Sequence, residues 1–124
     1  MNRQDRVIIC GGGPVGMISA LALVRQGIPV TVLESFSEPP QDPRAATVHP
    51  STLEMLDSVG LASGVIEKGL SAPAFQFRDR QTQEVVAVFD MKHLAGETDF
   101  PFAVQYEQWK LVRDAIKALS EYDI

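Results

Sequence analysis

The chain has 124 residues, of which 45% are hydrophobic and 22% charged, and its net charge at pH 7 is −5. This composition excludes a disordered or low-complexity protein, and no apolar run approaches the about 20 residues of a membrane-spanning helix. The negative charge makes nucleic acid and anionic membrane surfaces poor partners. The single cysteine, Cys10, permits no internal disulfide and is expected to be a small buried side chain in a strand. The lone cysteine and the polar N-terminus predict a cytoplasmic protein, and the length of the chain predicts one domain.

A strand, a helix and a second strand are expected at the beginning of the chain. Residues 6–10 form a β-branched apolar run that predicts a strand buried on both faces. Residues 14–26 carry apolar side chains at helical spacing, with Pro14 suited to the first turn and Gly27 to the end of the helix. Residues 29–34 are again typical of a strand. The sequence therefore predicts one βαβ unit of about 30 residues.

A proline-rich loop and two helices are expected next. Residues 35–50 show no hydrophobic period and predict a loop. Ser51 and Glu54 match a capping box at the start of a helix that Gly60 would end. A shorter helix is expected over residues 62–68.

The pattern then changes from helical to alternating. Phe75, Phe77 and Phe89 lie in two alternating segments around a polar turn, which predicts a β-hairpin in a mixed or antiparallel sheet. These three rings would form the core face of that sheet or line a substrate pocket. Residues 102–106 suggest a brief strand, and residues 108–120 a final helix. The expected fold class is α/β, a Rossmann-like βαβ unit with additional helices and a β-hairpin.

The loop between the first strand and the first helix carries the sequence Gly-Gly-Gly-Pro-Val-Gly, which satisfies the pattern G-x-G-x-x-G. Between a predicted strand and a predicted helix, and with Glu34 at the end of the next strand, this pattern is typical of dinucleotide-binding sites. Gly11 would allow the tight turn, Gly13 a close approach of the pyrophosphate to the backbone, and Gly16 close packing of helix on strand. The predicted cofactor-binding residues of this region are Gly11, Gly13, Pro14, Val15, Gly16, Glu34 and Ser35.

The carboxylate of Glu34 would accept hydrogen bonds from the adenosine ribose. No arginine follows it, so a 2′-phosphate on that ribose would have no partner there. The pattern alone leaves FAD and NAD open as ligands. The alternative is a glycine-rich turn beside a solvated glutamate.

Three segments in order along the chain resemble the FAD-dependent aromatic-ring hydroxylases, flavoprotein monooxygenases similar to p-hydroxybenzoate and phenol hydroxylases. The first, residues 7–17, reads Val-Ile-Ile-Cys-Gly-Gly-Gly-Pro-Val-Gly-Met. The second, residues 42–56, contains Asp-Pro-Arg-Ala-Ala-Thr-Val-His-Pro and leads into a helix. The third, residues 100–111, reads Phe-Pro-Phe-Ala-Val-Gln-Tyr-Glu-Gln-Trp-Lys-Leu. The resemblance covers essentially the whole chain.

The resemblance implies roles for two residues outside the glycine motif. Arg44 would lie against FAD and offer charge-assisted hydrogen bonds to a phosphate or ribose. Gln108 would hydrogen-bond the cofactor from the start of the last helix, with Gln105 as the competing choice. The alternative for Arg44 is an ion pair with Glu38 or Asp42, and for Gln108 an ordinary position at a helix start.

The resemblance also implies a reaction in which NADPH or NADH reduces the flavin and O₂ then hydroxylates a small, phenol-like aromatic substrate. Members of the family are several times longer, so residues 1–124 are expected to be the N-terminal part of a single, incomplete FAD-binding domain. Residues 72–106 would extend toward the substrate side. The missing remainder or a homo-oligomer would complete the fold, and the chain alone would not catalyse. No catalytic residue and no metal site are predicted, and the alternative function is a stand-alone module that binds FAD, NAD or ADP.

Overall fold

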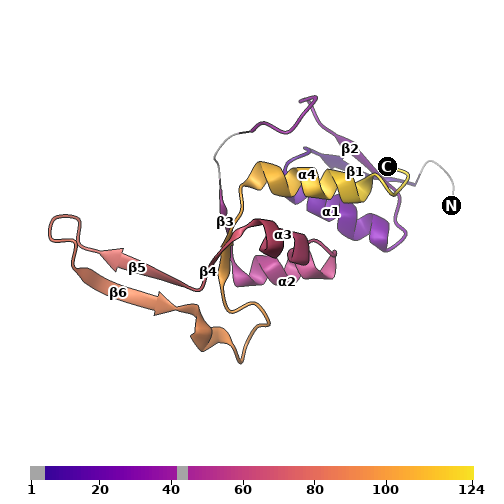
Figure 1. Cartoon of the computed structure of the whole chain (residues 1–124). Coiled ribbons are helices and arrows are strands. Elements are labelled where there is room, and N and C mark those ends of the chain that lie inside the picture. Colours follow the sequence, from indigo (N-terminus) through magenta and orange to yellow (C-terminus); the bar gives the residue numbers. More distant parts are fainter. Residues whose placement is uncertain (1–4, 42–44) are drawn as a thin grey trace.

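The computed structural model describes residues 5–41 and 45–124 and has an α/β fold (Figure 1). It begins with the strand β1 (Val7–Cys10), the helix α1 (Pro14–Arg25) and the strand β2 (Val30–Leu33). β1 and β2 pair in parallel, which confirms the predicted βαβ unit. Gly27 follows the end of α1 with φ of +76°, a conformation that favours glycine and ends the helix where the sequence predicted.

The core lies between α1 and three further helices, α2 (Pro50–Ser58), α3 (Ala62–Lys68) and α4 (Gln108–Leu119). α4 packs alongside α1, while α2 and α3 lie on the other side of α1 from the parallel strands (Figure 1). The largest fully buried side chains are Leu21, Leu53, Leu56, Val30, Val65 and Val104. Leu111, Val112 and Ala115 of α4 are buried in the same core, so apolar packing holds α4 against the βαβ unit.

A small antiparallel sheet lies between the helices and the residues that directly follow its strand β4 (Leu70–Ala72) (Figure 1). Its strands are β3 (Thr47–Val48), β4 and β7 (Ala103–Gln105), with β7 in the centre. Of these three strands, the sequence predicted only β7. β3 and β4 have two and three residues, too few for an alternating pattern to appear.

The predicted hairpin is formed by β5 (Ala74–Arg78) and β6 (Val85–Asp90), followed by the 3₁₀ helix η1 (Met91–Leu94). It is an antiparallel pair that extends away from the helices (Figure 1). Phe75 and Phe89 stack with their ring centroids 4.8 Å apart, and Phe77 contacts both rings edge to face, but all three rings are exposed. The expectation that they form the face of a core is therefore wrong for the described residues.

Two further expectations are wrong. β1 is not buried on both faces, because α1 packs on the side of Ile9, whereas Ile8 is 64% exposed and Cys10 is also exposed. The capping box of Ser51 is not formed either. α2 begins two residues earlier than a capping box at Ser51 requires, with Pro50 as its first residue and His49 as the N-cap, so the serine lies inside the helix. No helix within the described ranges has the length and apolar character needed to cross a membrane.

Candidate functional site

The turn from β1 into α1 has the geometry expected of a phosphate-binding loop. Gly11 has φ of +107°, which a residue with a side chain rarely adopts. A Cβ atom on Gly16 would lie 2.0 Å from the carbonyl oxygen of Gly11, so only glycine permits this approach of helix to strand. A Cβ on Gly13 would meet no atom within 4 Å. The space in front of Gly13 is therefore open, as the approach of a ligand to the backbone requires.

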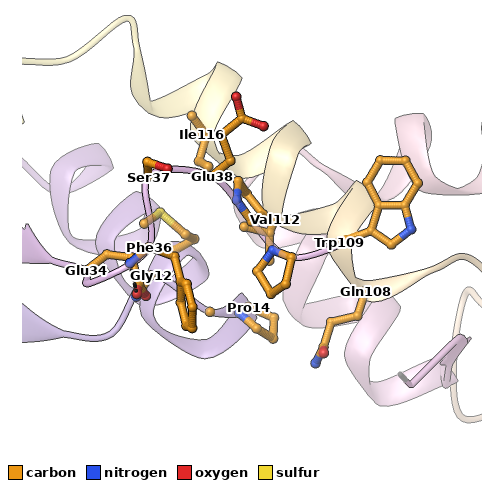
Figure 2. A pocket seen from close by; sticks show the side chains of 14 residues that line it. Gly12, Pro14, Glu34, Phe36, Ser37, Glu38, Gln108, Trp109, Val112 and Ile116 are labelled. Atoms are coloured by element: carbon orange, nitrogen blue, oxygen red, sulfur yellow. Dashed lines mark hydrogen bonds between the residues drawn. The ribbon is translucent and has the colours of Figure 1, made fainter. Parts of the chain in front are cut away.

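The carboxylate of Glu34 is held at this turn by four donors. Figure 2 shows Glu34 beside two of the residues that supply them, Gly12 and Phe36. The Oε2 of Glu34 accepts a hydrogen bond from the backbone N–H of Gly12 at 2.5 Å. Its Oε1 accepts from the backbone N–H of Ser35 at 2.6 Å, the Ser35 hydroxyl at 3.1 Å and the backbone N–H of Phe36 at 2.9 Å. The N–H groups of Phe36 and Gly12 contribute most to lowering the pKa of Glu34 to about 2. The carboxylate is therefore ionised and fixed in place at neutral pH.

Sequence reasoning missed the role of Gly12. A Cβ atom on Gly12 would lie 3.0 Å from Cγ and Oε2 of Glu34. A side chain at this position would therefore push the carboxylate away from the backbone N–H of Gly12, which donates a hydrogen bond to it. The available signal was that the variable position of the motif is itself a glycine.

A first cavity of about 340 Å³ opens between this turn and α4 (Figure 2). Gly12, Gly13 and Glu34 line one side, and Trp109 and Val112 of α4 line the opposite side. The segment from Phe36 to Pro40 closes a third side. Besides the glycine turn and Glu34, the polar residues Ser37, Glu38 and Gln108 line the cavity. Most of its other lining residues are apolar.

A second cavity of about 280 Å³ lies beyond the start of α1. Val15 of α1, Thr47 of β3 and Met55 of α2 line it, together with Tyr106, which precedes α4. Pro14 and Gln108 line both cavities, so the two spaces adjoin where α1 and α4 begin. A molecule longer than either cavity can extend from Glu34 past these two residues toward β3.

The predicted site residues are distributed over these two spaces. Pro14 and Gln108 lie at the junction, and Val15, which is 80% exposed, faces the second cavity. Ser35 lies beside the site and directs both its amide and its hydroxyl to Glu34. Arg44 falls outside the described residues.

Gln105 and Gln108, the two competing glutamines, have different surroundings. Gln105 ends β7, and its Oε1 accepts a hydrogen bond from the hydroxyl of Thr47 at 3.0 Å. Gln108 is the first residue of α4 and lines both cavities.

The site has the charge distribution of an anion-binding helix start. No acidic residue lies in the first turn of α1, so its unpaired N–H groups present their partial positive charge to the first cavity. Over residues 5–41 and 45–124, no group of three or more His, Cys, Asp or Glu side chains could hold a metal ion. A phosphate at the turn, a ribose at Glu34 and aromatic rings against the apolar walls are together the parts of a dinucleotide such as FAD. The residues present therefore fit that cofactor.

Comparison with known proteins agrees with this geometry. Residues 4–122 match the family model described as FAD binding domain. The chain is 36% identical to 6-hydroxy-3-succinoylpyridine 3-monooxygenase of Pseudomonas putida over its whole length, and 35% identical to para-nitrophenol 4-monooxygenase of a Pseudomonas species over 82% of its length. Among solved structures, p-nitrophenol 4-monooxygenase of Pseudomonas putida superposes on 94% of the chain with a TM-score of 0.89 and 33% identity.

The match covers only part of each relative. The chain spans 32% of the succinoylpyridine monooxygenase, 25% of the para-nitrophenol monooxygenase and 29% of the solved structure. It thus corresponds to about a third or less of these proteins.

Proposed function

Because the chain belongs to the FAD-binding domain family of flavin-dependent monooxygenases, we propose that it forms the FAD-binding portion of an enzyme that hydroxylates a phenol-like aromatic compound. The observation that carries the proposal is the pair of adjoining cavities, which extend from the glycine turn and Glu34 past Gln108 to β3. An adenosine half and a flavin half need two such spaces with a phosphate site near their junction.

Each predicted residue has a part in holding the cofactor. Among the described residues, the Oε2 of Glu34 accepts one hydrogen bond, from Gly12, and it can accept another from a ribose hydroxyl. The N–H groups at the start of α1 face the pyrophosphate, which approaches over the bare Cα of Gly13. Gln108 donates its side-chain amide at the junction of the cavities, and Arg44 adds a positive charge to the phosphates or ribose. Bound FAD supplies the redox chemistry, while the protein positions it and keeps water from it.

The names of two relatives support a class of substrate. 6-Hydroxy-3-succinoylpyridine and para-nitrophenol, in the names of two of them, are both aromatic rings that carry a hydroxyl group. We therefore expect a hydroxylated aromatic substrate, O₂, and NADPH or NADH as the reductant. A cytoplasmic location, where these nucleotides are available, fits this reaction.

The chain contributes the cofactor site rather than the whole catalytic centre. We propose that residues 1–124 act as the N-terminal part of one FAD-binding domain, and that residues 72–106 extend toward the substrate. A further polypeptide segment, or a second copy of the chain, would complete the domain.

A stand-alone dinucleotide-binding module is the second candidate. It is favoured by the fact that the described residues provide phosphate- and ribose-binding groups but no group identified as catalytic. On that alternative, the chain binds ADP, NAD and FAD through the first cavity alone, with similar affinities.

Isothermal titration calorimetry of the chain with FAD, NAD and ADP tests the two candidates. We expect FAD to bind at least tenfold more tightly than ADP, because only FAD also fills the second cavity. Equal affinities would favour the stand-alone module, and no heat with any of the three ligands would refute it.

Hydroxylation is tested in a chimera in which the chain replaces the matching segment of para-nitrophenol 4-monooxygenase. We expect the chimera to retain FAD and to consume O₂ with NADPH or NADH and a phenol. A chimera that is purified without flavin would contradict the proposal.

A further inference from the structure

Tyr106 connects two walls of the second cavity. It lies between the last residue of β7 and the N-cap of α4, lines the cavity and is only 3% exposed. Its hydroxyl donates a hydrogen bond to Oδ2 of Asp114 at 2.8 Å, two turns along α4. The side chain thus fixes the direction in which α4 leaves the sheet.

The backbone of Tyr106 connects to the other wall. Its N–H donates to the carbonyl oxygen of Ala46 at 2.6 Å, directly before β3. Ala45 and Thr47, on either side of that carbonyl, line the second cavity. One residue therefore links β3 and α4.

Asp114 is itself held in place. Its Oδ1 accepts from Nζ of Lys68 at 2.8 Å, at the end of α3, and its side chain is 21% exposed. Burial of the Tyr106 ring and its bond to Asp114 raise the pKa of the phenol, so the hydroxyl remains a donor at neutral pH.

The first cavity does not depend on this link. Its α4 wall is held against α1 by buried side chains, among them Val112 and Ala115. Loss of the Tyr106 hydroxyl would therefore change the spacing of α4 from β3 more than the packing of α4 on α1.

We propose that Tyr106 is a positioning residue for the flavin end of the site: its bond to Asp114 holds Gln108 at the distance from β3 that the second cavity requires. The inference rests on the proposed function, because it assumes that FAD occupies both cavities. It differs from a general contribution to stability, since it predicts an effect on one half of the ligand only.

The test compares FAD with ADP, which reaches only the first cavity. In the variant Tyr106→Phe we expect FAD to bind about tenfold more weakly, the effect of losing one hydrogen bond to a charged group, and ADP to bind within twofold of the wild type. Tyr122→Phe, a matched change near the C-terminal end of the chain, should alter neither affinity. Asp114→Asn keeps an acceptor oxygen for the phenol and should bind FAD more tightly than Asp114→Ala.

The outcomes separate the inference from the function beneath it. Unchanged FAD affinity in Tyr106→Phe, or equal losses for FAD and ADP, would overturn the positioning role and leave the proposed function intact. Wild-type chain that binds FAD no more tightly than ADP would overturn the proposed function, and the inference with it.

Discussion

The glycine turn allows two substitutions of the same kind to be compared at positions three residues apart. Gly13→Ala and Gly16→Ala each add one methyl group. The structure predicts that the first change affects binding and the second affects folding, because the space in front of the two Cα atoms is so different.

At Gly16 the added Cβ would lie 2.0 Å from the carbonyl oxygen of Gly11, whereas real Cβ contacts stay above 3.0 Å. The first turn of α1 must therefore move away from the loop by about 1 Å, against a well-packed core. Overpacking of this size costs about 3 kcal/mol, which lowers the melting temperature of a domain of this length by roughly 10 °C.

At Gly13 the backbone has φ of −71° and ψ of −177°, which alanine adopts without strain, and the added Cβ meets nothing within 4 Å. The variant should be as stable as the wild type, or more stable by about 0.5 kcal/mol through the loss of unfolded-state entropy. Its affinity for FAD should nevertheless fall at least tenfold, because the methyl group occupies the space through which a phosphate approaches the backbone.

Thermal unfolding followed by circular dichroism gives the stability of each variant, and calorimetric titration with FAD well below the melting temperature gives its affinity. Each variant is the control for the other. Wild-type FAD affinity in Gly13→Ala would refute the assignment of the open space to the phosphate, and an unchanged melting temperature in Gly16→Ala would refute the close-packing argument.

Three further predictions concern the side chains of the site. The pKa of Glu34 should be about 2, because its backbone donors stabilise the charged form. Since this pKa lies below the ordinary 4.5, the contribution of Glu34 to stability is complete above pH 4.5 and is lost as the pH falls toward 2. A carbon-13 NMR titration that places the pKa near 4.5 would contradict the observed hydrogen bonds. Arg44→Ala should lower FAD affinity about tenfold, whereas Arg80→Ala in the hairpin turn should not, and equal affinities in the two variants would count against the role implied by the family. Gln108→Ala should weaken FAD binding several-fold while Gln105→Ala leaves it within twofold, because only Gln108 lines the cavities, and calorimetry showing the reverse order would assign the contact to Gln105.

The parts of the fold that could be predicted from the sequence are those set by nearby residues. The βαβ unit follows from a periodic pattern and from glycines at fixed spacing, and Gly27 ends α1 through its own φ angle. β3 and β4 could not be predicted, because each exists through pairing with β7, which lies more than 30 residues away along the chain. The apolar run of β1 indicated a strand correctly but could not show that α1 would cover only one of its faces.

The candidate site divides in the same way. The roles of Gly11 and Gly16 and the position of Glu34 follow from the motif. The link between Tyr106 and Asp114, by contrast, needs α4 to be oriented against β7, which no local pattern encodes. The second cavity also depends on four elements that meet only in the folded chain.

The charge of the chain makes the local character of the site essential. A protein with a net charge of −5 does not attract a dinucleotide with two phosphates from a distance, so the attraction must come from groups at the site itself. The N–H groups at the start of α1 provide it without a formal charge. The negative charge of Glu34 would oppose this attraction of the phosphates. Four donors surround the Glu34 carboxylate, however, and offset part of its negative potential at the turn. The same contacts keep that carboxylate ionised, so that it can accept from a ribose hydroxyl close to the phosphates.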